Sequence, residues 1–141
     1  MRAEKISNDT RNMVINLLSN IENLKLEDNI IDNCCVLLKD NGNIVGTISY
    51  EKYNNIALIR YFVFKKNIEL DSLLLLYNCL QKNLSEKEIK DVIGIVNTEE
   101  VKSVFEYLGF EIVDKEKVYF DETQFNKTSY SQCDVFHKFV F

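Results

Sequence analysis

Residues 43–76 read NIVGTISYEKYNNIALIRYFVFKKNIELDSLLLL, and this stretch decides how the rest of the chain is organised. Ile44–Glu51 alternates between apolar and polar side chains, as a strand does. Ile56–Phe64 is an apolar run interrupted only by Arg60, which is typical of a central strand buried on both faces. An unpaired buried charge is costly, so Arg60 requires an anion or a good set of hydrogen bonds.

The segments before this stretch have recognisable helix, strand and turn signals. Asn41-Gly42 predicts a type I′ hairpin turn, because both residues tolerate positive φ. We expect four further elements from propensity, capping residues and apolar spacing. They are a strand at Arg2–Ile6, a helix capped by Ser7 or Asn8, a short helical turn within Leu26–Ile31, and a strand at Cys34–Leu38.

The residues from Asp71 onward predict two more helices and three strands. Asp71 is expected to cap a leucine-rich helix, and Asn97 to cap a second one, with Glu100 completing a capping box. Gly109 stands where a left-handed residue ends that second helix. The expected strands are Val92–Val96, Phe110–Val113 and Asp134–Phe141, and Asp114–Gln132 is expected to be an irregular excursion.

The resulting order is β-α-α-β-β-β-α-β-α-β-β, which predicts a mixed α+β fold. The connection from Ile56–Phe64 through a helix to Val92–Val96 is a βαβ crossover, so this pair is expected to be parallel and its neighbours antiparallel. We therefore predict one domain, residues 1–141, with a mostly antiparallel sheet of six to seven strands and helices on both faces.

Composition narrows the classes of function. The chain has 141 residues, 46% of them hydrophobic, and a net charge of −5 with its Lys and Arg scattered. That pattern argues against nucleic-acid and membrane partners. No signal sequence or bilayer-length apolar run is visible, so we expect a cytoplasmic protein. The aromatic-rich strand Val135–Phe141 is an expected pairing edge for a homodimer.

The four cysteines and the single histidine predict no metal site. Cys34 and Cys35 are neighbours that point to opposite faces of a strand, and no CxxC spacing exists. Ordinary reduced thiols are the favoured interpretation. A nucleophilic pair of Cys133 with His137 is the alternative.

Several motifs resemble the GNAT acyltransferase superfamily. NIVGTISYE at Asn43–Glu51 resembles its third strand, and VFEYLGFEIVDKE at Val104–Glu116 resembles its late helix–strand junction. The segment Gly46–Arg60 is similar to a branch of small amino-acid N-acetyltransferases from arsenic-resistance operons and to the acetyltransferase domain of N-acetylglutamate synthase. Residues 128–133 are a weak version of that branch's last motif.

The resemblance implies an acetyl-CoA-dependent N-acetyltransferase acting on a small-molecule amine. It implies that Glu51 is the catalytic base, and that Arg60 and Tyr53 bind the substrate, Arg60 through a carboxylate. A structural Arg60 paired with Glu51 or with another acidic residue is the alternative. The cofactor-binding residues that it implies are Phe62, Val63, Phe64, Ser72, Leu73 and Phe105.

The stretch Lys66–Leu74 departs from the family's pyrophosphate loop. It has no glycine, and it places Glu69 and Asp71 where backbone amides would receive phosphate. Lys65 and Lys66 compensate in part. Two other hypotheses are therefore kept as alternatives to the acetyltransferase. One is a GNAT-like domain that has lost CoA binding and binds a ligand or a partner, and the other is an unrelated α+β fold.

Overall fold

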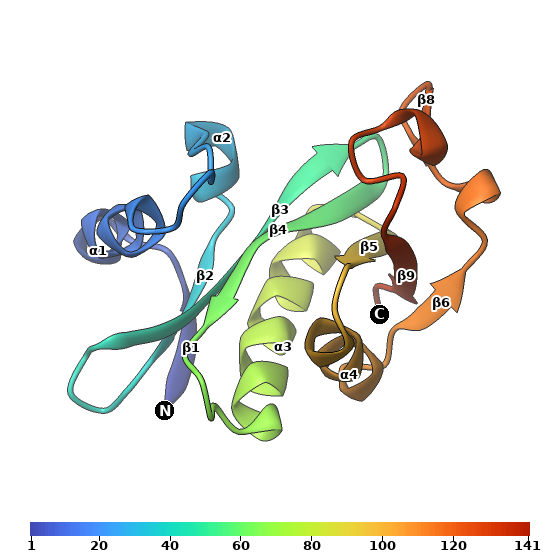
Figure 1. Cartoon of the computed structure of the whole chain (residues 1–141). Helices are drawn as coiled ribbons and strands as arrows, with labels where there is room; N and C mark the ends of the chain where they lie inside the picture. The colour runs from blue at the N-terminus through green and yellow to red at the C-terminus, as the bar shows by residue number, and fades with distance from the viewer. The chain divides into compact units, whose positions relative to one another are not determined.

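A computed structural model describes the whole chain, Met1–Phe141 (Figure 1). Its helices are α1 (Asn8–Ser19), α2 (Asp28–Ile31), α3 (Leu70–Glu86) and α4 (Glu99–Tyr107), with 3₁₀ turns η1 (Lys115–Lys117) and η2 (Phe125–Lys127). Its strands are β1 (Arg2–Lys5), β2 (Cys35–Leu38), β3 (Ile44–Tyr53), β4 (Ile56–Phe64), β5 (Asp91–Val96), β6 (Glu111–Val113), β7 (Tyr119–Phe120), β8 (Thr123–Gln124) and β9 (Asp134–Phe139).

Seven strands form one mixed sheet in the order β1-β2-β3-β4-β5-β9-β6, and β7 and β8 form a separate hairpin. The parallel ladder between β4 and β5 runs from Ile56 opposite Asp91 to Leu58 opposite Ile93. The β1–β2, β2–β3, β5–β9 and β6–β9 pairs are antiparallel. The predicted element order, the parallel pair and the mostly antiparallel α+β sheet are confirmed.

The chain forms two compact units. Unit 1 is Met1–Glu51 with Arg60–Asn83, and unit 2 is Lys52–Ile59 with Leu84–Phe141. The predicted single domain of residues 1–141 stays a prediction. None of the helices combines the length and the apolar character that crossing a bilayer requires.

In unit 1, helices cover both faces of the first strands. Val14 and Leu18 of α1 pack with Val36 and Leu38 of β2 in one buried cluster. Cys35 points the other way, because side chains alternate along a strand, and contacts α3. Figure 1 shows α1 and α3 on opposite sides of these strands, as predicted.

The first hairpin of unit 1 differs from its predicted turn. Gly42 has φ of 86°, but Asn41 is not in the left-handed region, so a type I′ turn is wrong. The amide of Gly42 bonds to the carbonyl of Lys39, and the register shifts between Leu37 and Leu38. A longer connection with a left-handed Gly42 and a shifted register joins the two strands instead. A left-handed residue after a tight turn accommodates the right-handed twist of paired strands, as a type I′ turn also does.

Two predicted helix caps are also wrong. Asp71 lies inside the first turn of α3, because that helix already begins at Leu70. A carboxylate in a first turn still favours the helix dipole. For α4, Thr98 and not Asn97 is the N-cap, and its side chain accepts from the amide of Val101 at 3.2 Å. Asn and Thr are both favourable N-cap residues, so propensity alone does not decide which of the two adjacent residues caps the helix.

In unit 2, α4 packs against β5, and the excursion between β6 and β9 contributes side chains to a buried cluster against the sheet strands. Phe120 and Phe125 of that excursion pack with Leu58, Ile93 and Val135. The predicted irregular segment therefore contains a buried cluster, two 3₁₀ turns and a small hairpin. β9 lies between β5 and β6 and is paired on both sides, so β9 is not the edge that was predicted. A homodimer stays a prediction.

Candidate functional site

Arg60 of β4 joins two carboxylates in unit 1. Its Nη1 donates to Glu51 Oε1 at 2.7 Å, and its Nη2 lies 3.7 Å from Glu27 Oε2. The Arg60 side chain is 21% exposed and that of Glu51 is 23% exposed, so the pair is largely shielded from water. The pairing of Arg60 with Glu51, which the sequence left open as an alternative, is therefore present. The three groups together carry one excess negative charge.

The residue after Arg60 breaks the regular geometry of β4. Tyr61 has φ of 51°, a rare conformation for a bulky residue within a strand. The hydroxyl of Thr47 donates to the carbonyl of Tyr61 at 2.8 Å and holds that turn of the backbone. The positive φ of Tyr61 interrupts the extended backbone conformation of β4 at this one residue.

The side chain of Tyr61 fastens the loop before α2. Its hydroxyl donates to the carbonyl of Lys25 at 2.9 Å and accepts from the amide of Glu27 at 2.9 Å. Burial raises the pKa of Tyr61. The side chain of Tyr61 therefore links β4 to the loop that supplies Glu27. Glu27 is one of the two carboxylates around Arg60.

We expect Tyr61→Phe to lower the free energy of unfolding by about 1–3 kcal/mol, because it leaves the amide of Glu27 and the carbonyl of Lys25 without their buried partner. Chemical denaturation measures the loss. Tyr119→Phe is the matched control, since Tyr119 is 49% exposed and its change should stay within about 0.5 kcal/mol. Equal losses in the two variants would contradict the fastening role.

The predicted pantetheine-binding residues Phe62, Val63 and Phe64 complete β4. Each is half-buried, and the rings of Phe62 and Phe64 lie 5.3 Å apart. The amide of Lys65 donates to the carbonyl of Val45 at 3.0 Å, which ties the end of this segment to β3. The segment is the extended end of β4, and its contact with a cofactor stays a prediction.

The loop from β4 to α3 is Lys65–Glu69. Asn67 has φ of 64° and takes the left-handed conformation that a glycine would otherwise supply. The missing glycine therefore does not prevent this turn. The amides of Ser72 and Leu73 donate to the carbonyl of Glu69 at 3.0 and 3.2 Å. The backbone amides of these two predicted cofactor-binding residues are thus already engaged within the helix.

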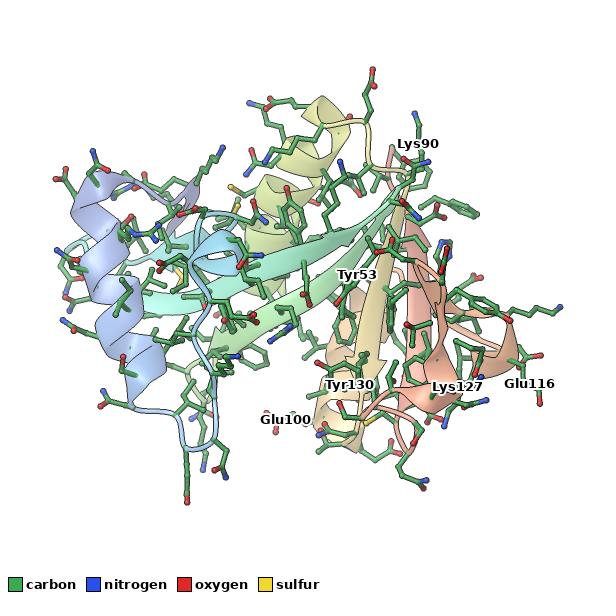
Figure 2. The ribbon with its side chains drawn as sticks, turned by 90° about the horizontal axis from the view of Figure 1, so that it is seen from above. Tyr53, Lys90, Glu100, Glu116, Lys127 and Tyr130 are labelled. Carbon is green, nitrogen blue, oxygen red and sulfur yellow. The ribbon has the colours of Figure 1, made fainter.

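Tyr53 and Phe105 fall in unit 2. The ring of Tyr53 lies 5.1 Å from that of Phe120, within the cluster that Tyr130 also joins (Figure 2). Phe105 is 2% exposed and lies edge-on to Phe110 at 4.8 Å. Both residues are packing residues in this structure, and their predicted contacts with substrate and cofactor are untested.

An Asp–His pair in unit 2 was not predicted. Asp91 Oδ1 and His137 Nε2 are 2.8 Å apart and line a cavity of about 510 Å³ whose other walls include Ile56 and Val118. Cys133 precedes β9 and His137 is its fourth residue, so roughly 13 Å of strand separates them. The alternative nucleophilic pair of Cys133 and His137 is wrong. No spacing signal in the sequence relates positions 91 and 137.

The sequence matches no protein-family model and no curated protein. Solved structures do match. A GNAT-family acetyltransferase from Staphylococcus aureus has a TM-score of 0.70 at 14% identity, with 99% of each chain covered. A Mycobacterium tuberculosis protein in complex with CoA has a TM-score of 0.74 at 12% identity, with 100% of each chain covered.

The third similar structure is N-acetylglutamate synthase from Neisseria gonorrhoeae, in complex with CoA and N-acetyl-glutamate. Its TM-score is 0.72 at 13% identity, and the alignment covers 99% of this chain and 35% of the synthase. The chain thus spans about a third of that enzyme's length. These likenesses show that the chain has the fold of the GNAT acyltransferase superfamily, and the alternative of an unrelated α+β fold is wrong.

Proposed function

We propose that the protein is an acetyl-CoA-dependent N-acetyltransferase that acts on the primary amine of a small molecule. The observation that carries the proposal is the fold, which the chain shares over nearly its whole length with solved acetyltransferases. Two of the three similar structures described above contain CoA. The likeness to N-acetylglutamate synthase favours an amino acid or an analogue as the acceptor, by analogy of fold.

The end of β4 suits the pantetheine arm of acetyl-CoA. Amide groups of an extended ligand can bond to a strand backbone as an added strand would. The parallel ladder to β5 ends at Leu58, and Tyr61 then turns the strand. Phe62–Phe64 is therefore the backbone segment that we assign to the arm. Bound acetyl-CoA supplies the acetyl group as a thioester.

The backbone conformation at the start of α3 is compatible with binding the phosphates of CoA. The charges at this helix end are less favourable for binding them. Asn67 provides the left-handed turn, and Lys65 and Lys66 provide two cations. Glu69 and Asp71 place two carboxylates at the same helix end, and these repel a phosphate. We therefore propose that Lys65, Lys66 and the positive end of the α3 dipole attract the pyrophosphate, with an affinity that the carboxylates weaken.

We expect Glu69→Gln to tighten acetyl-CoA binding about two- to fivefold, because it removes one exposed negative charge from the phosphate end. Calorimetric titration at low ionic strength measures the change, and added salt should reduce it. Glu86→Gln, at the opposite end of the same helix, is the matched control and should leave the affinity as it is. An unchanged affinity in both variants would place the phosphates elsewhere.

Glu51 is the group that we assign to remove the proton of the acceptor amine. An amine attacks a thioester only in its neutral form, so a base must take its proton directly or through a water molecule. Arg60 fixes one carboxylate oxygen of Glu51 at 2.7 Å. The excess negative charge of the Glu27–Arg60–Glu51 cluster attracts an ammonium group to that base.

Arg60 has a second proposed role in choosing the acceptor. Its Nη2 makes the longer contact, 3.7 Å to Glu27, and a substrate carboxylate could replace Glu27 there. An acetyl-transfer assay on amino acids and their amides, with CoA release followed by chromatography, tests the function. Acetyl-CoA-dependent product from a primary amine supports the proposal. Acetyl-CoA binding without transfer to any amine tested would contradict the catalytic part.

A further inference from the structure

Two of the four cysteines meet in unit 1. Cys35 of β2 and Cys79 of α3 bring their Sγ atoms to 3.2 Å. A disulfide bond is about 2.05 Å long, so the sulfur atoms need to approach by only about 1.2 Å. Side-chain rotation about the Cα–Cβ bonds changes sulfur positions on this scale. The strand and the helix are already in place around the pair.

The two thiols have unequal surroundings. Cys35 is fully buried, and its sulfur also accepts from Asn83 Nδ2 at 3.3 Å. Cys79 is half-buried and reaches solvent. The hydrogen bond between the sulfur atoms lowers the pKa of Cys79, and the charge of Lys82 lowers it further, against opposing effects of burial and Glu4. The same hydrogen bond and burial raise the pKa of Cys35. Cys79 is therefore the thiol that ionises first.

The other two cysteines lack this arrangement. Cys34, the residue before β2, lies in the apolar cluster under α1, and burial raises its pKa to about 11. Cys133 lies in unit 2, before β9. Neither cysteine has a second sulfur atom placed as Cys35 Sγ is placed beside Cys79. The contact between β2 and α3 therefore determines which two cysteines form a disulfide on oxidation.

We propose that Cys35 and Cys79 are a peroxide-sensitive thiol pair that closes a reversible disulfide between β2 and α3. Cys79 is the attacking thiol and Cys35 the resolving thiol. Disulfide formation by this pair is independent of acetyl transfer, because it requires only the short distance between the sulfur atoms and the exposure of Cys79.

The chemistry balances with a hydroperoxide as the oxidant. The Cys79 thiolate attacks the peroxide, forming an S–O bond while the O–O bond breaks, and an alcohol or water leaves with a proton from solvent. The Cys35 sulfur then attacks the Cys79 sulfenic acid, forming the S–S bond while the S–O bond breaks. The leaving hydroxide takes the Cys35 proton and departs as water. The peroxide is reduced by two electrons, and the two thiols are oxidised.

The test treats the folded, reduced full-length protein with stoichiometric hydrogen peroxide. The protein is then unfolded in denaturant so that every remaining thiol, including the buried Cys34, can be alkylated. Intact mass and peptide mapping are measured on this sample. We expect two alkylated cysteines, Cys34 and Cys133, a loss of two hydrogen atoms, and a peptide that links Cys35 to Cys79. Dithiothreitol should restore four alkylated thiols. Because the new bond restricts the unfolded chain, the oxidised protein should also melt at a higher temperature than the reduced protein.

Cysteine variants and a denatured sample distinguish a specific Cys35–Cys79 disulfide from non-specific oxidation of thiols. Cys133→Ser should form the same link. Cys79→Ser should form none, and Cys35→Ser should accumulate a sulfenic acid at Cys79 that dimedone traps. In denaturant, oxidation should lose its preference for the Cys35–Cys79 link. Four freely alkylated thiols after peroxide, or a link through Cys34 in the folded protein, would overturn the proposal.

Discussion

Glu51→Gln is expected to lower kcat/KM for acetyl transfer about 100-fold or more, the usual contribution of a positioned general base. Glutamine keeps the shape of the side chain and can still accept from Arg60 Nη1, so folding should change little. The affinity for acetyl-CoA should also be kept, because the bound cofactor is assigned to Phe62–Phe64 and α3. Steady-state kinetics and calorimetric titration on the same protein preparations measure these quantities.

Glu27→Gln is the matched control for this prediction. Glu27 faces the same guanidinium as Glu51 but at the longer distance of 3.7 Å, and its removal changes the charge of the cluster equally. If Glu51 acts as the base, Glu27→Gln should leave most of the rate. If the cluster acts only through its charge, the two variants should lose rate alike, and that result would remove Glu51 from the base role.

Gly94→Ala is expected to destabilise the protein by about 1–3 kcal/mol, the usual cost of overpacking a core. A Cβ at Gly94 would lie 2.7 Å from both Cε1 and Cζ of Phe105, a ring that is itself 2% exposed. Phe105→Ala should cost more, about 3–5 kcal/mol, because it leaves a cavity under α4. Chemical denaturation of each variant gives these differences.

Gly46→Ala is the control for the Gly94 prediction. Both glycines are buried strand residues, but a Cβ at Gly46 meets nothing closer than 3.5 Å, so this variant should be neutral or slightly stabilising. Gly94→Ala combined with Phe105→Leu should cost less than the two changes added together, since the smaller side chain makes room. Strict additivity, or equal losses at Gly46 and Gly94, would show that the ring does not limit position 94.

Much of the fold was predictable because local signals and burial agree. β4 begins and ends at the predicted residues, Ile56 and Phe64, since an apolar run between a turn and a polar loop leaves little freedom. Gly109 has φ of 93° at the predicted end of α4. The errors are at caps and turns, where neighbouring residues such as Asn97 and Thr98 compete with similar free energies.

The candidate site was predictable only in part. The pairing of Glu51 with Arg60 could be foreseen as an alternative, because the two residues flank one hairpin. The contributions of Glu27 and Tyr61 could not, since they depend on a loop distant in sequence and on a residue with positive φ inside a strand. The contact between Cys35 and Cys79 spans 44 positions and leaves no spacing signal either.

Binding of acetyl-CoA to the purified full-length protein is the most direct test of the proposed function. We predict a saturable calorimetric titration and a melting temperature that rises with ligand concentration, since acetyl-CoA would bind only the native state. Glu69→Gln should shift both readouts toward tighter binding. Absence of heat and of any thermal shift at millimolar acetyl-CoA would contradict the account and leave a GNAT fold that has lost its cofactor.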